Sequence, residues 1–539
     1  MIKCGMEKCS VGRDPRSRRP CGMMKQKGEK EMAGKKKSGL VWFVFLAAAL
    51  LGMGSLAWAA PSGKVTLVMD NDAPTMDPHR HAERSGVTVN WQMFDSLMFR
   101  QNDMKIVGGL AESYKLISPT VIQLNLRKNV QFHNGEPFNA EAVKFSLERV
   151  LDPKTKSPRI SSVNWLNSVE VVDNYTVRLN LKNPHPLWME DLHNLAMVPP
   201  GYLKEKGDSH FAENPVGTGP YKFVKWTRGQ EIQMTANTKY FKGEPRIETG
   251  VIKIIPDAST RVAALLSGAV DLMRGISPEE IPVLKANPNL QVFTVPILRF
   301  QWFSLSDAMN PQSPLYKKAV RQAINYAVNV PEIVNNIVGG LGTPTVVMNP
   351  MHFGYDPNVK PYPYDPAKAK ALLKEAGYPN GFEMTLHYTP VNMIKGDEVS
   401  QAIQAHLAQV GINMKLQKWS GVGYMDIVKS GRAKPAFGIN WGSFGVFDGD
   451  AILTPFFRSG QQYCFFHTPE LDKIIDAQRQ EMDPQKRKEL MSKAQQILRE
   501  EAPWIFMYAF KTVEGANAKL DYKPRSDEIF SIYEIGFKK

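Results

Sequence analysis

Cysteine is scarce in this chain: there are four in 539 residues, and three of them, Cys4, Cys9 and Cys21, lie close to the N-terminus. Beyond that segment Cys464 stands alone, so it has no partner for an intramolecular disulfide. A chain of this size can be stabilised by its packed core without disulfides. We expect Cys464 to be a small buried side chain with no redox role.

The short motifs of common enzymes are absent as well. The sequence contains no His-Glu-x-x-His zinc motif, no nucleophile elbow and no Gly-x-x-x-x-Gly-Lys phosphate loop. His79 and His81 form a His-x-His pair, which is too small for a metal site, and we expect them to lie in a surface loop. Asp448 and Asp450 resemble a carboxylate pair, but an exposed turn accounts for them equally well. We therefore predict no enzymatic activity, no cofactor and no metal site.

The N-terminal 59 residues are typical of a basic leader with a secretory signal. Three lysines, at 35–37, precede an uncharged apolar run from Leu40 to Leu56, and Ala57-Trp58-Ala59 follows. This order predicts cleavage after Ala59. The alternative is a retained anchor, because the run is long enough to cross a hydrocarbon core of about 30 Å. No cysteine follows it, so a lipid anchor is not expected, and a start at Met32 would give a signal of ordinary length.

Little excess charge remains once this leader is set aside. Residues 1–59 hold 12 of the 67 basic and 4 of the 53 acidic residues, which leaves 55 basic and 49 acidic residues, a net charge of +6, over 480 residues. No basic stripe interleaved with aromatic residues is present, so we expect no nucleic-acid partner.

The length of the remaining chain predicts two or three domains. Predicted strands and helices alternate, which favours an α/β protein with mixed sheets. A strand is expected over Lys64–Val68, and a hairpin over Val169–Leu181 with its turn at Asp173-Asn174. Further helices are predicted after three Ser/Asp-Pro pairs and around one apolar-periodic segment, at residues 313–329, 365–377, 483–502 and 399–411.

One eighteen-residue segment, Leu126–Val143, carries the strongest signal. It reads as a strand, a polar turn and a helix capped by Asn139, with Val143, Leu147 and Val150 on one face. The segment also resembles the signature of the extracellular solute-binding proteins of family 5, the periplasmic peptide- and nickel-binding proteins of ABC importers. Asn214–Tyr221 resembles the second strong motif of that family. Three weaker matches follow in the same order, at residues 261–271, 320–327 and 364–370.

This resemblance implies a two-lobed periplasmic-binding-protein fold of the class II, cluster C type, with mixed sheets, an extra subdomain and a hinge of two chain crossings. The first lobe would comprise residues 60–295, with the extra subdomain at about 105–215. The second lobe would comprise residues 296–505, and residues 506–539 would return to the first lobe. Hinge bending would close the lobes over a ligand.

The resemblance also implies a ligand-facing loop at residues 440–450, with Trp441 as an apolar wall and Asp448 within reach. A core position is the alternative for Trp441. Asp72 and Arg84 are further candidates to face the cleft. Dipeptide-binding relatives carry an aspartate three residues after the tryptophan and an arginine shortly after a Pro-Val pair. The corresponding positions here are Phe444 and Met393, so both charged anchors are replaced by apolar residues.

The expected function is that of a periplasmic substrate-binding component, exported through a cleaved signal and acting as a monomer. Its partners would be a small organic solute or short peptide and an inner-membrane ABC permease with a separate ATPase. The missing anchors argue against unmodified dipeptides. Binding of a nickel chelate or another non-peptide solute, and a sensor or chaperone role without transport, remain alternatives.

Overall fold

The computed structural model describes residues 60–391, 393–442 and 445–539. The apolar run Leu40–Leu56 and the predicted cleavage site after Ala59 lie outside the described residues, as does Phe444. Among the helices of the described ranges, none combines the length and the apolar character needed to cross a bilayer.

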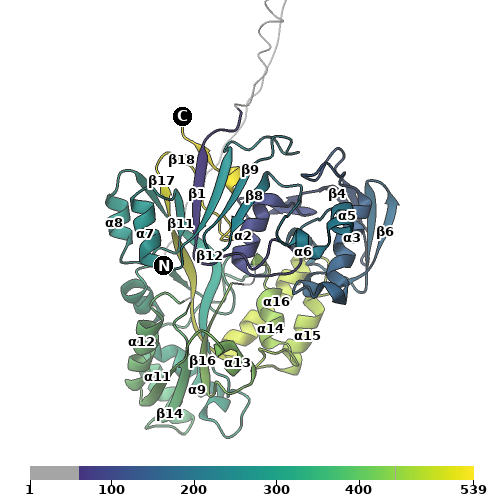
Figure 1. Cartoon of the computed structure of the whole chain (residues 1–539). Coiled ribbons are helices and arrows are strands. Elements are labelled where there is room, and N and C mark those ends of the chain that lie inside the picture. Colours follow the sequence, from purple (N-terminus) through teal and green to yellow (C-terminus); the bar gives the residue numbers. More distant parts are fainter. Residues whose placement is uncertain (1–59, 392, 443–444) are drawn as a thin grey trace, which may run out of the picture. The chain divides into compact units, whose positions relative to one another are not determined.

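Eleven strands of the described chain form one mixed sheet, in the order β15-β14-β16-β12-β17-β11-β1-β10-β9-β8, with β13 paired to β17 (Figure 1). At one end lie β1 (Lys64–Met69), β8 (Tyr221–Thr227), β9 (Glu231–Ala236), β10 (Thr249–Ile254) and β11 (Leu272–Arg274). At the other end lie β13 (Gly342–Pro344), β14 (Phe382–Tyr388), β15 (Ile412–Lys418) and β16 (Ala436–Trp441). We call the first set and its helices the first lobe, and the second set and its helices the second lobe.

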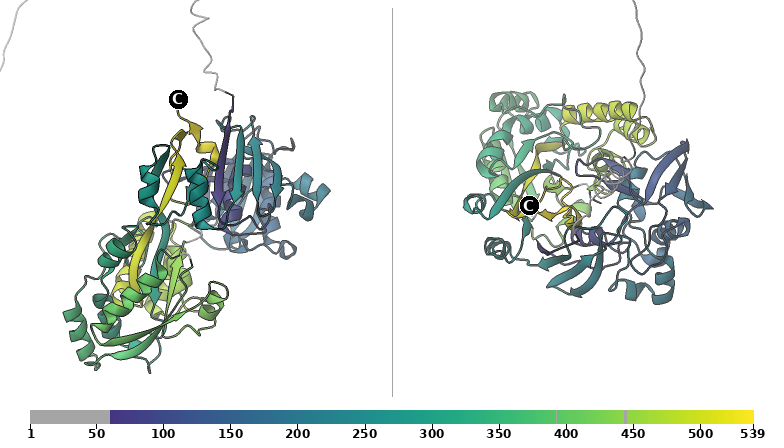
Figure 2. Two further views of the ribbon diagram at one scale, coloured as in Figure 1. Left: turned by 60° about the vertical axis from the view of Figure 1, so that its left-hand side comes forward. Right: turned by 90° about the horizontal axis from the view of Figure 1, so that it is seen from above.

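Two long strands, β12 (Leu290–Ser304) and β17 (Trp504–Asn517), join the lobes. They are antiparallel neighbours in the middle of the mixed sheet (Figures 1 and 2). In the first lobe β17 also pairs with β11, and in the second lobe β12 also pairs with β16. Their mutual register shifts between Pro296 and Phe300. The hinge of two crossings expected from the sequence therefore corresponds to one strand pair with an irregularity at its centre.

Helices cover both faces of the sheet in each lobe, which buries apolar side chains on each side. In the first lobe α7 packs on one face and α2 on the other. In the second lobe α9, α11 and α12 pack on one face and α14, α15 and α16 on the other. The first-lobe helices are α2 (Arg84–Met93), α7 (Ala258–Leu266) and α8 (Ile281–Ala286). The second-lobe helices are α9 (Lys318–Ala327), α10 (Val330–Glu332), α11 (Pro366–Glu375), α12 (Gly396–Ala408), α13 (Tyr424–Lys429), α14 (Asp450–Phe457), α15 (Pro469–Gln478) and α16 (Pro484–Glu501).

A separate four-stranded antiparallel sheet carries its own apolar core. Its strands are β4 (Ala111–Ser118), β5 (Val121–Leu126), β7 (Thr176–Leu181) and β6 (Leu166–Asp173). The helices α3 (Ala140–Leu151), α4 (Trp188–His193), α5 (Pro200–Lys206) and α6 (Asp208–Phe211) lie in the same stretch of sequence. Two short pairs complete the strands: β2 (Met98–Arg100) with β3 (Ile106–Gly108), and β18 (Leu520–Asp521) with β19 (Gly536–Phe537).

Most predicted elements are confirmed because each has a local signal. The Asn139 side chain accepts the Ala142 N–H at 3.1 Å and caps α3, and the three apolar residues predicted for one face are buried. The 173–174 turn joins β6 to β7. The helix expected from residue 313 differs: Ser313 caps only a short 3-10 turn over Pro314–Tyr316, and α9 begins at Lys318. Extended backbone at Lys317 separates the two.

Replacing the cap of α3 tests this local account. Asn139→Ala should lower the free energy of unfolding by about 1 kcal/mol, because one N–H at the helix start loses its acceptor. Urea unfolding followed by circular dichroism measures the change. Asn139→Asp keeps an acceptor and should stay near the unmodified protein; equal losses in both variants would contradict the capping role.

Candidate functional site

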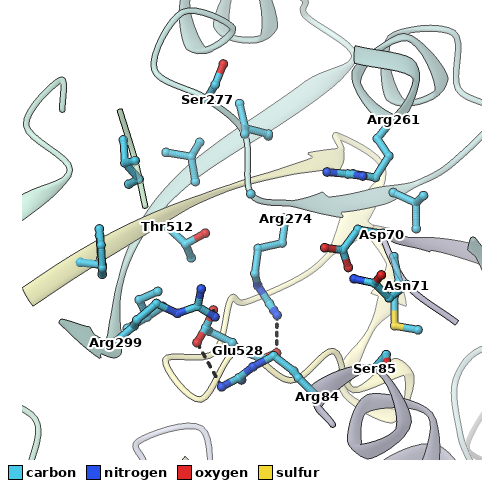
Figure 3. Close-up of a pocket in the computed structure, with 18 of the residues that line it drawn as sticks. Asp70, Asn71, Arg84, Ser85, Arg261, Arg274, Ser277, Arg299, Thr512 and Glu528 are labelled. Carbon is cyan, nitrogen blue, oxygen red and sulfur yellow. Dashed lines mark hydrogen bonds and ion pairs between the residues drawn. The ribbon is translucent and has the colours of Figure 1, made fainter. Parts of the chain in front are cut away.

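A cavity of about 940 Å³ lies beside the irregular part of the β12–β17 pair (Figure 3). Its walls come from the loop after β1, the start of α2, the segment after β11, and the C-terminal segment after β17. The second lobe contributes Leu341 and residues 393–395. The charged residues of the lining are Asp70, Asp72, Glu83, Arg84, Arg261, Arg274, Glu279, Arg299, Lys395, Lys511 and Glu528. The cavity therefore offers both signs of charge within the size range of small-molecule sites.

Three arginines, Arg84, Arg274 and Arg299, converge on Glu528, and we call them the guanidinium triad (Figure 3). Arg84 Nη2 lies 3.3 Å from Glu528 Oε2, and Arg299 Nη2 lies 3.4 Å from Oε1. Arg274 Nη1 donates to the backbone oxygen of Glu528. Glu528 itself is buried and has a φ of 58°, in the left-handed region that non-glycine residues seldom adopt.

Backbone and side-chain contacts hold the triad in place. Arg84 begins α2, and its Nη1 donates to the Asp527 oxygen at 2.8 Å. Arg274 ends β11, and its Nε donates to Glu514 Oε1 on the neighbouring strand β17 at 2.6 Å. The Arg274 guanidinium also lies 4.2 Å from the centre of the Phe530 ring. Arg299 lies in the irregular part of β12, where a break in the register allows a side chain to point away from the regular ladder.

The titration behaviour of the site reflects an excess of positive charge. Burial opposes ionisation of Glu528, yet the charges of Arg84, Arg299 and Arg274 outweigh it and hold the pKa of Glu528 below its usual value. For Arg84, burial lowers the pKa, and repulsion by Arg299 and Arg274 lowers it further despite the attraction of Glu528. The Glu528 carboxylate therefore stays ionised, and the three guanidiniums are only partly compensated by it.

Asp72 lines the cavity, but its carboxylate serves the β8–β9 hairpin. Its oxygens accept the Trp226 ring N–H at 3.0 and 3.1 Å and the Gly229 N–H at 2.7 Å. The neighbouring Asp70 is exposed, lines the same cavity and lies near Arg274 in the view of Figure 3. Of the two acids, Asp70 has the oxygens that remain available to a ligand.

Met393 also lines the cavity, on the side of the second lobe. Two residues later, Lys395 Nζ lies 2.5 Å from Glu279 Oε1, which belongs to the first-lobe part of the lining. The position that the resemblance assigned to a ligand-binding arginine is thus apolar, and the nearby lysine is paired across the cavity.

Trp441 does not line this cavity. Its half-buried ring packs in the second lobe, 5.1 Å from the Phe456 ring and 5.7 Å from the Tyr463 ring. The residue after it approaches the triad, because a Cβ on Gly442 would lie 3.6 Å from Arg84 Nη2 and 3.9 Å from Arg299 Nε. The predicted ligand-facing loop therefore meets the charged site through its backbone at Gly442.

Asp448 lies away from the cavity lining as well. Its carboxylate is buried and receives both Nη groups of Arg487, with Nη2 to Oδ1 at 2.8 Å. Burial raises the pKa of Asp448, and Arg487 counteracts the rise. Asp450 is buried too and accepts the side-chain amide of Gln478. The exposed turn considered for these two residues is wrong, because α14 begins here and packs on α15.

The expectation of surface histidines is also wrong. His79 and His81 are buried, and His79 Nε2 lies 2.8 Å from the Ala196 oxygen. Burial lowers the pKa of each to about 4. Across residues 60–391, 393–442 and 445–539, no group of three or more His, Cys, Asp or Glu side chains is arranged to hold a metal ion.

The sequence predicts no functional role for Arg274, Arg299 or Glu528, because no local motif marks them. They become neighbours only through the pairing of β11, β12 and β17. Arg84 and Asp72 could be proposed because they follow the first strand closely.

Asp448→Asn should lower the free energy of unfolding by about 3–5 kcal/mol, because Arg487 would keep a buried charge without its partner. Urea unfolding measures this. Asp521→Asn is the matched control, since the Arg246–Asp521 pair is about half exposed on both sides and such pairs contribute about 0–1 kcal/mol. Unchanged stability with loss of ligand affinity in Asp448→Asn would assign the residue to the ligand instead.

Comparison with known proteins agrees with this architecture. Residues 105–464 match the family described as "Bacterial extracellular solute-binding proteins, family 5 Middle". The glutathione-binding protein GsiB of Pectobacterium atrosepticum is 29% identical over 504 residues, which cover 91% of this chain and 97% of that protein.

Two solved structures are similar over 88% of the chain. One is the periplasmic binding protein DppA from Helicobacter pylori in complex with the peptide STSA, at 28% identity and a TM-score of 0.74, with 98% of that chain covered. The other is NikZ from Campylobacter jejuni in complex with Ni(L-His), at 25% identity and a TM-score of 0.74, with 99% of that chain covered. The two-lobed mixed α/β fold, the order of its motifs and these similarities agree: the chain belongs to the bacterial extracellular solute-binding proteins of family 5.

Proposed function

We propose that this protein is the periplasmic substrate-binding component of an ABC importer. It captures a small peptide-like or other organic solute between its lobes and delivers it to an inner-membrane permease, whose ATPase is a separate polypeptide. DppA supports the transport role, since it is described as an ABC transporter-associated periplasmic binding protein. GsiB, named as a glutathione-binding protein, supports the class of solute. The protein acts by binding and release and has no catalytic activity of its own.

The observation that carries this proposal is the cavity beside the β12–β17 pair. It draws its walls from both lobes, so a solute inside it contacts both at once. The guanidinium triad offers N–H donors, and Asp70 offers acceptors in the same lining. A solute that carries both an anionic and a cationic group, as peptides and glutathione do, complements this distribution of charge.

The proposal includes the position of the hinge and of the lobes. The first lobe comprises residues 60–295 and 506–539, with an extra subdomain at about 105–215, and the second comprises residues 296–505. The register shift between Pro296 and Phe300 supports the boundary between residues 295 and 296. A monomer is sufficient for this role, because the cavity is built by one chain.

Titration calorimetry with glutathione and the tetrapeptide Ser-Thr-Ser-Ala tests the function directly. We expect at least one of them to bind with one solute per protein and a dissociation constant in the micromolar range or below. Absence of heat and of thermal stabilisation with both solutes would contradict the peptide-like class.

Closure of the lobes is the second expectation. Because the solute contacts both lobes, its binding energy should favour the conformation in which they approach each other. Small-angle scattering should show a smaller radius of gyration at saturation than in its absence. An unchanged scattering profile at saturation would rule out hinge closure.

Export is the third expectation. Protein recovered from an exporting host should begin at or near Ala60, because the basic, apolar and Ala-x-Ala elements follow one another in the order of a cleaved secretory signal. N-terminal sequencing measures this. Membrane-bound protein with an intact Leu40–Ala59 segment would instead establish an anchor.

A further inference from the structure

We propose that the guanidinium triad is the anchor for a ligand carboxylate, which joins Glu528 between Arg84 and Arg299. This inference rests on the proposed function and specifies it: the solute must carry a carboxylate, and that group binds at the first lobe and the hinge. The charged anchor absent at Met393 is thereby replaced by residues from other parts of the fold.

Arg299 supplies most of the available donors. A guanidinium carries five N–H groups, and the one hydrogen bond or ion pair of this side chain within the described residues is the 3.4 Å contact from Nη2 to Glu528. Its Nε and Nη1 groups have no acceptor among the described residues. Arg299 is one-quarter exposed and lines the cavity, so these donors can reach a solute.

The other two arginines are more constrained and set the charge of the site. Arg84 uses Nη1 on the Asp527 oxygen and holds Glu528 with Nη2, which leaves its Nε free of hydrogen bonds within the described residues. Arg274 is fixed by Glu514 and by the backbone of Glu528, while its buried Nη2 has no hydrogen-bond partner among the described residues. A buried donor without an acceptor is costly, and a bound anion is a common remedy.

The distances from Glu528 to Arg84 and Arg299 indicate that the site has room for a second carboxylate. Charge-assisted contacts between guanidinium and carboxylate are typically about 2.7–2.9 Å long, whereas Glu528 lies 3.3 and 3.4 Å from Arg84 and Arg299. One carboxylate thus bridges two guanidiniums loosely. Three positive charges against Glu528 and Glu514 leave the group with one uncompensated charge, which matches a single carboxylate better than a phosphate dianion.

Gly442 of the second lobe lies next to the triad and brings no side chain to it. Its α-carbon faces Arg84 and Arg299, at a distance where an added Cβ would be in ordinary contact with both. The backbone of the second lobe can therefore approach a carboxylate held by the triad, which couples recognition of the anion to the approach of the lobes.

A comparison of Ser-Thr-Ser-Ala with its C-terminal amide tests the inference by calorimetry. The unmodified protein should bind the acid at least tenfold more tightly than the amide. In Arg299→Gln the affinity for the acid should fall about thirtyfold or more, as for loss of one partner of a buried charged contact, while the affinity for the amide should change less than threefold. Arg84→Gln should give the same pattern if it folds.

Arg261→Gln is the matched control, because Arg261 lines the same cavity but donates to the Ile255 and Pro256 oxygens. It should preserve the preference for the acid. Equal binding of acid and amide by the unmodified protein, or an acid preference that persists in Arg299→Gln, would overturn the carboxylate anchor and leave the proposed function intact. Failure of both peptides and of glutathione to bind would remove the proposed function and this inference with it.

Discussion

The backbone hydrogen bonds between β12 and β17 hold the two lobes on a common axis, and the rest of the structure is arranged around them. Each strand pairs with its partner in both lobes, and each also pairs with a different third strand at one end: β17 with β11 and β12 with β16. A regular ladder of this length would be stiff. The register shift at residues 296–300 interrupts it at the level of the cavity, where Arg299 lies outside the regular ladder.

The same interruption explains why a costly group of charges is found there. Three arginines within reach of one carboxylate repel one another, and their partial burial strengthens the repulsion. Glu514 and Glu528 offset most of it from β17 and from the segment that follows. Such an arrangement contributes less to stability than an apolar core would. Groups of perturbed charges beside a cavity are typical of functional sites.

The features that the sequence predicts correctly depend on residues close together in the chain, and those that it does not predict depend on residues far apart. Asn139 and Asp365 were predicted as helix caps because a cap depends on residues two or three positions away, and both caps are present. Family motifs extended this to the two-lobed fold. The triad could not be predicted, because Arg274 and Glu528 are 254 positions apart and meet only through strand pairing.

Burial of polar side chains is the second feature that local sequence does not predict here. The sequence predicts a surface loop for the histidines at 79 and 81 and offers an exposed turn as an alternative for Asp448, because polar residues in turns usually are exposed. Here Arg487 pairs with Asp448 within the core, and Arg149 donates to His79. His81 instead lies against Asn90, whose side-chain nitrogen is 2.6 Å from His81 Nε2. A sequence shows that a residue is polar, but it does not show whether a distant arginine will accompany it into the interior.

The position of Glu528 has a consequence for the order in which the protein is made. Glu528 follows all three of its arginine partners, which occur at positions 84, 274 and 299. During synthesis, or during export that starts from the N-terminus, the three arginines emerge first. The strand β17 follows, and Glu528 comes after it. The guanidinium triad therefore reaches its final arrangement only after Glu528 has followed, and until then its positive charges lack that carboxylate.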